Sequence, residues 1–231
     1  MRDTIYRYTI YGERHSGTKF LKNIIDAHFN LEVTWEYGWK HFFGFYKDAL
    51  YRNVTDTIFL CIVRNPYDWL QAMYNQPHHI NGWYSNSNNS IQNPFNSMRL
   101  FLKSEIRSYN TPNIISDDYK KYFQENIHDR NLLTGKPYKN IFELRKLKLF
   151  YLYRLKDIAP HIVLIKYEDL LKDYMSFVRH VSITENIPIK ENRRVVGVAK
   201  KNSYDIDISI KNLINTNIDW DTEAKFGYTK K

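Results

Sequence analysis

Residues 6–29, YRYTIYGERHSGTKFLKNIIDAHF, decide the fold of this chain of 231 residues. An apolar and aromatic run stops at Gly12, a polar loop follows, and apolar residues then return at helical spacing at Phe20, Ile24 and Ile25. The pattern predicts a strand, a tight loop and a helix. Such a loop directs several backbone N–H groups and the positive end of a helix dipole at one point, which suits a phosphate or a sulfate.

The spacing Gly12-x-x-x-x-Gly17 matches the first half of a Walker A loop, where lysine and then serine or threonine follow the second glycine. Here Thr18 precedes Lys19, so the hydroxyl that would bind magnesium is out of place. We therefore expect an anionic ligand that needs no metal. The alternative is a plain glycine turn that joins a strand to a helix.

A second stretch strengthens the first interpretation. Residues 58–63, IFLCIV, form the continuous apolar run that is typical of a buried parallel strand. The run leads into Arg64-Asn65-Pro66, where Pro66 suits the first position of a helix and Asn65 its cap. Arg64 is then expected at the carboxyl end of a central strand, where open α/β sheets bind their ligands.

These motifs resemble those of sulfotransferases that use 3′-phosphoadenosine 5′-phosphosulfate, and Tyr167-Glu168-Asp169-Leu170 after a later apolar run is similar to a third motif of that family. The resemblance implies an α/β three-layer sandwich with a central parallel sheet, of the P-loop NTPase-like sulfotransferase fold. It also implies transfer of a sulfuryl group from this nucleotide, which leaves adenosine 3′,5′-bisphosphate, with no metal.

The family resemblance assigns donor-binding roles to both motifs. The loop residues are expected to bind the 5′-phosphosulfate, and Arg64 is expected to bind the 3′-phosphate. His15 stands where the family has a lysine, so Arg14 or Lys19 is expected to supply the fixed charge. The predicted loop residues are Arg14, His15, Ser16, Gly17, Thr18 and Lys19.

The second motif also departs from the family, because Ala72 stands where a serine usually contacts the 3′-phosphate. A basic loop near the C-terminus wraps that phosphate in the family, and Lys200-Lys201 is the candidate here. The alternative is that these lysines belong to a solvated basic helix face.

The resemblance further implies a general base after the second predicted strand, residues 31–35. Lys40-His41 is similar to the lysine and histidine found there in cytosolic members, and a histidine, which ordinarily titrates near pH ~6.5, suits removal of the acceptor's proton. Glu36 is the rival base, and His15 is a further candidate. His41 is alternatively a member of an aromatic cluster.

Residues 76–98 lose periodicity and are rich in Asn, Ser, Gly and Pro, which is loop chemistry. We expect an acceptor-binding lid with Trp83 and Tyr84 stacking on the acceptor, or alternatively a disordered surface insertion. A carbohydrate hydroxyl is the favoured acceptor, followed by tyrosine or a phenol, and an amine is also open.

Residues 142–158 are expected to form an amphipathic helix that exposes basic residues, among them Arg145 and Lys148. The apolar face is expected to bury Leu144, Leu147, Leu155 and Ile158. A membrane-surface or nucleic-acid-binding helix is the alternative. Helices are also expected over 95–105 and 118–126, and a buried strand over 161–166. Glu168-Asp169 is expected to cap the helix that follows that strand.

The composition predicts one α/β domain over residues 1–231. A net charge of +9 suits a polyanionic donor or an acidic acceptor. The single cysteine, Cys61, and the lack of a signal-peptide or membrane-spanning pattern predict a cytoplasmic protein. A P-loop small-molecule kinase and a basic nucleic-acid-binding protein without catalysis remain as alternatives, and the second is supported by charge alone.

Overall fold

The computed structural model describes residues 4–37, 40–41, 54–77, 95–106, 108–109, 128–129, 131, 134, 136–190 and 204–231. Three predictions lie outside these residues. They are the helix over 118–126, the basic pair Lys200-Lys201, and residues 78–94 of the expected lid, which include Trp83 and Tyr84.

The described residues form an α/β structure whose elements are, in chain order, β1 (Arg7–Tyr11), α1 (Thr18–His28), β2 (Glu32–Val33), β3 (Thr57–Val63), α2 (Pro66–Asn75), α3 (Met98–Lys103), β4 (Ser108–Tyr109), β5 (His128–Asp129), α4 (Ile141–Arg154) with a 3₁₀ turn over Leu155–Asp157, β6 (Ile162–Lys166), α5 (Tyr167–Glu185), α6 (Ile208–Asn217) and α7 (Trp220–Ala224). They divide into two compact units. The first spans residues 1–65 and 152–202, and the second spans 66–151 and 203–231. The single domain inferred from composition stays a prediction.

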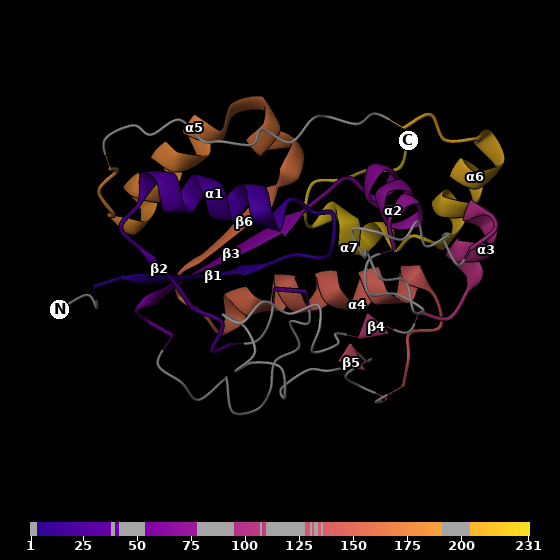
Figure 1. Ribbon diagram of the computed structural model, residues 1–231, viewed down its shortest axis with the longest axis horizontal. Coiled ribbons are helices and arrows are strands. Elements are labelled where there is room, and N and C mark those ends of the chain that lie inside the picture. Colours follow the sequence, from indigo (N-terminus) through magenta and orange to yellow (C-terminus); the bar gives the residue numbers. More distant parts are fainter. Residues whose placement is uncertain are drawn as a thin grey trace, which may run out of the picture. The chain divides into compact units, whose positions relative to one another are not determined.

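The first unit is built on a four-stranded sheet of order β2-β1-β3-β6, in which every neighbouring pair is parallel. Helices α1 and α5 lie side by side along this sheet (Figure 1). The sequence-based prediction of an α/β fold with a central parallel sheet flanked by helices is therefore confirmed.

Strand register places the ends of the central strands together. Tyr11 at the end of β1 is the partner of Cys61 in β3, and Val63 at the end of β3 is the partner of Lys166 at the end of β6. All seven residues of β3 are buried, as expected for a strand with neighbours on both edges. The segments that follow β1, β3 and β6 thus leave the same edge of the sheet.

Most predicted boundaries agree with the structure. The loop between β1 and α1 and the helix that starts at Pro66 occur as predicted, and β2 and α3 are present but shorter than expected. Strand β6 is also present, but its alternating burial, with Leu164 39% exposed, is that of an edge strand in the described sheet. The sequence predicted a fully buried strand there because it does not show which strand has a neighbour on each edge.

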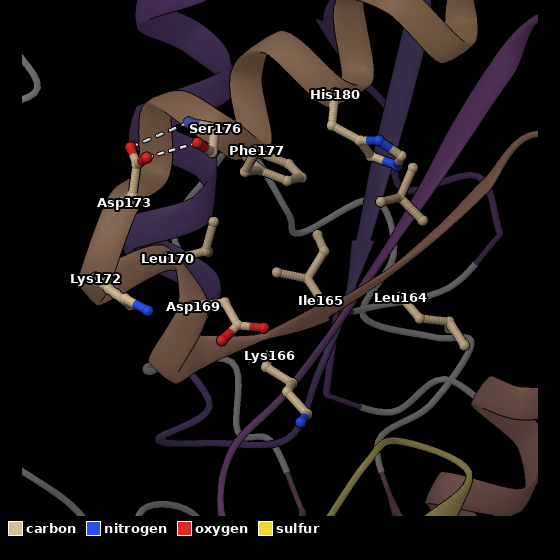
Figure 2. Close-up of a pocket in the computed structure, with 11 residues that line it drawn as sticks. Leu164, Ile165, Lys166, Asp169, Leu170, Lys172, Asp173, Ser176, Phe177 and His180 are labelled. Carbon is tan, nitrogen blue, oxygen red and sulfur yellow. Dashed lines mark hydrogen bonds between the residues drawn. The ribbon is translucent and has the colours of Figure 1, made fainter.

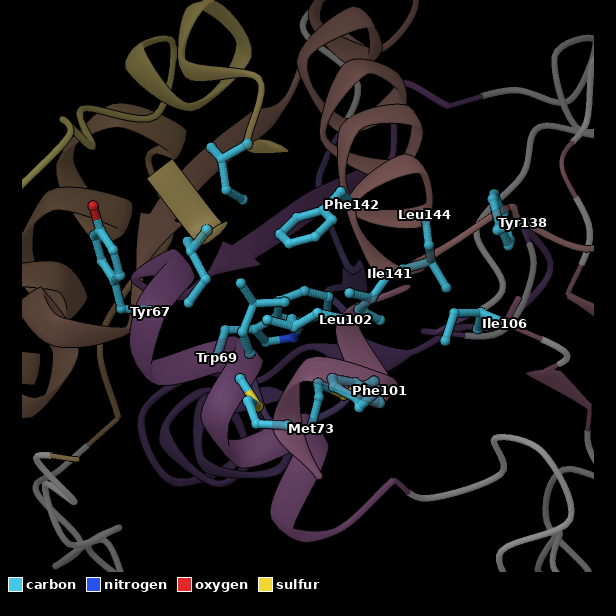
Figure 3. Close-up of a cluster of buried hydrophobic side chains, with 14 of the residues drawn as sticks. Tyr67, Trp69, Met73, Phe101, Leu102, Ile106, Tyr138, Ile141, Phe142 and Leu144 are labelled. Carbon is cyan, nitrogen blue, oxygen red and sulfur yellow. The ribbon is translucent and has the colours of Figure 1, made fainter. Parts of the chain in front are cut away.

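The second unit has its own apolar core, to which α2, α3, α4 and α6 contribute side chains (Figure 3). Trp69, Phe101 and Leu144 are completely buried in it. The aromatic ring of Phe95 lies edge-on to that of Phe101, with centroids 5.0 Å apart. The prediction that Leu144 faces a core is confirmed.

The prediction that α4 exposes its basic residues is partly wrong. Arg145 and Lys148 are 4% and 3% exposed, whereas Ile158, expected on the apolar face, is 40% exposed. Burial of Arg145 is possible because its guanidinium binds both carboxylate oxygens of Glu223 in α7 and lies over the ring of Trp69. A long-range partner of this kind is invisible in the local pattern. Within the described part of the chain, no helix combines the length and apolar character needed to cross a membrane.

Candidate anion-binding site

Three predicted motifs meet at the carboxyl edge of the sheet in the first unit. The loop Gly12–Gly17 follows β1, Arg64 follows β3, and Tyr167 follows β6 directly. Strand β2 lies on one side of β1 and β3 on the other, so the strand order reverses between β1 and β3. Open α/β sheets bind ligands at such a switch point, outside the carboxyl ends of the strands.

The loop after β1 adopts a backbone that prepares the first turn of α1 for an anion. His15 and Gly17 have positive φ angles of 61° and 91°, and the Ser16 N–H donates to the Glu13 carbonyl at 3.1 Å. Helix α1 begins at Thr18, and its N-cap residue is Gly17, which has no side chain that could cap the first amides. The amides of this first turn have no partner within the helix, so a bound anion would satisfy them.

Both loop glycines are required by close packing. A Cβ atom on Gly17 would lie 2.3 Å from Cδ2 of Tyr167, in addition to the strain of its left-handed backbone. A Cβ atom on Gly12 would lie 2.6 Å from Cγ2 of Ile62 and 2.7 Å from the Ile62 carbonyl oxygen. The loop is therefore pressed against β3 and the start of α5.

Arg14, which the sequence suggested as a source of fixed positive charge, is buried and paired with an acid. Its side chain is 2% exposed, and Nη1 forms an ion pair with Oε2 of Glu13 at 3.1 Å. The same oxygen accepts from the Arg14 backbone N–H at 3.3 Å. Glu13 was absent from the predicted site, although an acid next to Arg14 was visible in the loop. Because Glu13 offsets part of the Arg14 charge, Lys19, whose side chain is exposed, is the stronger source of positive charge for a ligand.

Arg64 joins the second motif to the loop. Its Nη1 donates to the His15 carbonyl oxygen at 3.1 Å, and its guanidinium carbon lies 5.1 Å from the centre of the Tyr167 ring. The side chain is about nine-tenths buried and held on two sides. Two motifs separated by some fifty residues in sequence thus form one cluster.

Glu168 makes a contact that the sequence did not predict. It lies in the first turn of α5, as expected, and its Oε1 accepts a hydrogen bond from the Asn65 backbone N–H at 2.8 Å. The third motif therefore reaches the second through this carboxylate and through the Tyr167 ring. This contact could have been expected from position alone, because Tyr167-Glu168 and Arg64-Asn65 each follow a strand of the same parallel sheet.

Lys40 and His41 are hydrogen-bonded to Gly12, the first residue of the loop. The Gly12 N–H donates to the Lys40 carbonyl at 3.0 Å, and His41 Nδ1 lies 2.7 Å from the Gly12 carbonyl oxygen. A carbonyl oxygen only accepts, so Nδ1 is the donor and carries the proton. In the neutral ring this leaves the lone pair on Nε2, the atom that a general base needs.

The surroundings of Lys40 make its charged form less stable than that of an exposed lysine. Burial, with smaller effects from the charges of Lys19 and Lys22, lowers the pKa of Lys40 to about 8. The Lys40 ammonium is destabilised mainly by burial and to a smaller extent by repulsion from Lys19 and Lys22. Negative charge brought to the loop would relieve that repulsion.

Glu36, the rival base, lies elsewhere. Its carboxylate is 3.0 Å from Nη1 of Arg7, and the other terminal nitrogen of Arg7 binds Asp56 at 2.9 Å. Arg7 starts β1, and a five-residue strand rises about 13 Å from its first to its last Cα. The structure therefore places Glu36 at the amino end of β1, whereas the loop and His41 lie at the opposite end.

Three other residues that the sequence analysis singled out are buried. Ser16 and Thr18 are buried at the start of α1, and Ala72 is buried in α2. A separate pocket of about 450 Å³ lies between β6 and α5, with Leu164, Lys166, Asp169 and Phe177 among its lining residues (Figure 2). The residues that line it include none of the predicted site residues.

The same view shows an interruption of α5. Asp173 has non-helical backbone angles, φ −158° and ψ 85°, and its carboxylate accepts from the Ser176 N–H at 3.1 Å and from the Ser176 hydroxyl at 2.5 Å (Figure 2). These bonds lower the pKa of Asp173. Asp173 therefore caps the second part of the helix.

The described residues contain no group of three or more His, Cys, Asp and Glu side chains placed to hold a metal ion. No protein-family model matches the sequence, and no curated protein or solved structure matches it either.

Proposed function

We propose that the chain is a sulfotransferase of the P-loop-like type, which transfers a sulfuryl group from 3′-phosphoadenosine 5′-phosphosulfate to an acceptor hydroxyl or amine. The observation that carries the proposal is the contact of Arg64 with the His15 carbonyl oxygen. It brings together the two motifs that resemble the 5′-phosphosulfate and 3′-phosphate sites of that family.

The donor would lie across the switch point between β1 and β3. The amides at the start of α1, with Ser16, Thr18 and Lys19, would hold the 5′-phosphosulfate, and Arg64 would hold the 3′-phosphate. Preorganised donors of this kind stabilise the charge that develops as a sulfuryl or phosphoryl group is transferred. Lys200-Lys201 stays a predicted second contact to the 3′-phosphate.

His41 is the proposed general base. Its Nε2 would take the proton of the acceptor hydroxyl as the acceptor oxygen forms a bond to sulfur. The bond between sulfur and the bridging oxygen breaks, and its electron pair stays on the 5′-phosphate of adenosine 3′,5′-bisphosphate. The hydrogen bond from Nδ1 to the Gly12 carbonyl fixes the ring in the required tautomer. The acceptor proposed first is a carbohydrate hydroxyl.

The test is thermal unfolding with adenosine 3′,5′-bisphosphate, compared with ATP and magnesium at the same ionic strength. A ligand at 100 times its Kd adds about 2.7 kcal/mol of stability, which corresponds to roughly 5–10 °C for a chain of this size. A shift with the bisphosphate that disappears in Arg64→Ala supports the proposal. A shift with ATP and magnesium alone would replace it with a P-loop kinase. No shift with either would move attention to nucleic acid and to the salt dependence of its binding.

A further inference from the structure

Two neighbouring residues at the start of α5 contact both halves of the proposed donor site. The Tyr167 ring lies against Gly17, so closely that a Cβ atom there would be 2.3 Å from it, and the same ring lies under the Arg64 guanidinium. Glu168 accepts the N–H of Asn65, the residue after Arg64, at 2.8 Å. The dipeptide thus touches the loop after β1 and the turn after β3.

The turn after β3 is fixed by this dipeptide and by the loop. Arg64 Nη1 donates to His15, the Arg64 guanidinium stacks on Tyr167, and the Asn65 N–H donates to Glu168. Only the last of these contacts holds the backbone of the turn through a charged acceptor. A hydrogen bond to a charged group contributes more than one between neutral groups.

We propose that Tyr167-Glu168 is a positioning element that sets the spacing between the loop and Arg64, and that it thereby selects a ligand with two anionic groups over a ligand with one. This inference rests on the proposed function, because it assumes that the loop and Arg64 each bind one anionic group of the same nucleotide. Glu168 acts through Asn65 and Arg64 and does not touch the ligand.

The experiment compares the affinities of adenosine 3′,5′-bisphosphate and adenosine 5′-monophosphate, measured by titration calorimetry. In Glu168→Ala the backbone of the Arg64 turn loses its contact with a charged acceptor, so we expect the affinity for the bisphosphate to fall about tenfold and that for the monophosphate to change less than about twofold. Glu168→Gln keeps an oxygen that accepts the Asn65 N–H and should retain the preference of the native chain. Asp169→Ala removes the next carboxylate of the same helical turn and is the matched control.

Equal losses for both nucleotides in Glu168→Ala, or no loss for either, would overturn the proposed selection. Hydrogen exchange of the Asn65 amide gives a second readout that needs no ligand. Glu168→Ala should speed this exchange at least about tenfold, and Asp169→Ala should not. Unchanged exchange in Glu168→Ala would overturn the positioning role. If the native chain does not prefer the bisphosphate, the proposed function fails, and the exchange result then decides the positioning role by itself.

Discussion

Arg64 Nη1 donates a hydrogen bond to the carbonyl oxygen of His15 at 3.1 Å, so the side chain that follows β3 is tied to the backbone that follows β1. His15 has a positive φ of 61°. That backbone conformation is uncommon for a residue with a side chain, and contacts with its surroundings must stabilise it. The guanidinium of Arg64 is one such contact and also a candidate ligand for an anion.

Replacement of Arg64 should therefore affect nucleotide binding strongly. A charge-assisted contact to a phosphate contributes about 1.5–3 kcal/mol, so Arg64→Ala should weaken binding of adenosine 3′,5′-bisphosphate by roughly 10- to 150-fold in calorimetry. Arg179→Ala, which removes an exposed arginine of α5, is the control for net charge. Equal affinity in the two variants would remove Arg64 from the donor site.

His41 and Glu36 are distinguished by turnover at saturating donor. Loss of a general base lowers kcat by about 10²–10⁴-fold, so His41→Ala should lose turnover by this factor and retain its affinity for the bisphosphate. Glu36→Gln should keep most of its kcat, because Glu36 pairs with Arg7 at the amino end of β1. The opposite result, with turnover lost only in Glu36→Gln, would assign the base to Glu36.

Stability should rise with pH because of Lys40. Its pKa is lowered to about 8 in the folded chain, so between this value and the ordinary lysine pKa the unfolded chain binds more protons than the folded one. Below about pH 8 both states are protonated and the full cost of the partly buried ammonium is present. From pH 8 to about 10.5 the free energy of unfolding should increase, by on the order of 1–3 kcal/mol. Urea titrations at pH 7.5 and 10 measure the increase, and Lys40→Met should show a smaller one.

The buried ion pair of the second unit should contribute strongly to the stability of that unit. Arg145 and Glu223 are 4% and 2% exposed, so Glu223→Ala leaves a buried, unpaired charge and should lower the free energy of unfolding by about 3–5 kcal/mol. Lys146 pairs with Asp219 at 2.5 Å, also between α4 and the start of α7, but is 57% exposed. Lys146→Ala should cost less than about 1 kcal/mol in the same urea titration. Similar losses in both variants would contradict this account of Arg145.

Gly17→Ala tests the packing of the loop. The new methyl would collide with the Tyr167 ring and occupy a left-handed backbone position, so we expect a loss of about 1–3 kcal/mol in unfolding free energy. In a Tyr167→Ala background the collision is absent and only the backbone strain remains, so the cost of Gly17→Ala should fall. An equal cost in both backgrounds would show that Tyr167 does not restrict the loop.

The sequence predicted the elements that local patterns determine. The switch from the apolar run of β1 to the helical spacing of α1, and the position of Pro66, were sufficient to place the loop and Arg64. Helices α6 and α7 were not predicted, and the five residues of α7 contain too little periodicity for a pattern to be recognised. The burial of Arg145 was missed because its partner lies 78 residues away.

The site was predictable to the level of motifs, and its contacts were not. Nothing in the order of residues shows that Glu13 neutralises Arg14, that Glu168 reaches Asn65, or that Glu36 is held by Arg7. The last two are contacts between segments that the register of the parallel strands brings together, whereas the first is a local ion pair that depends on side-chain conformation.

The complete burial of β3 has a practical consequence for experiments on this chain. Its only cysteine, Cys61, lies at the middle of that strand with no exposed surface, and burial raises the pKa of its thiol. Thiol reagents need both access and a thiolate, so alkylation of Cys61 requires the sheet to open. The rate of alkylation therefore reports how often the first unit opens. For the same reason, dyes can be attached to new surface cysteines while Cys61 stays in place.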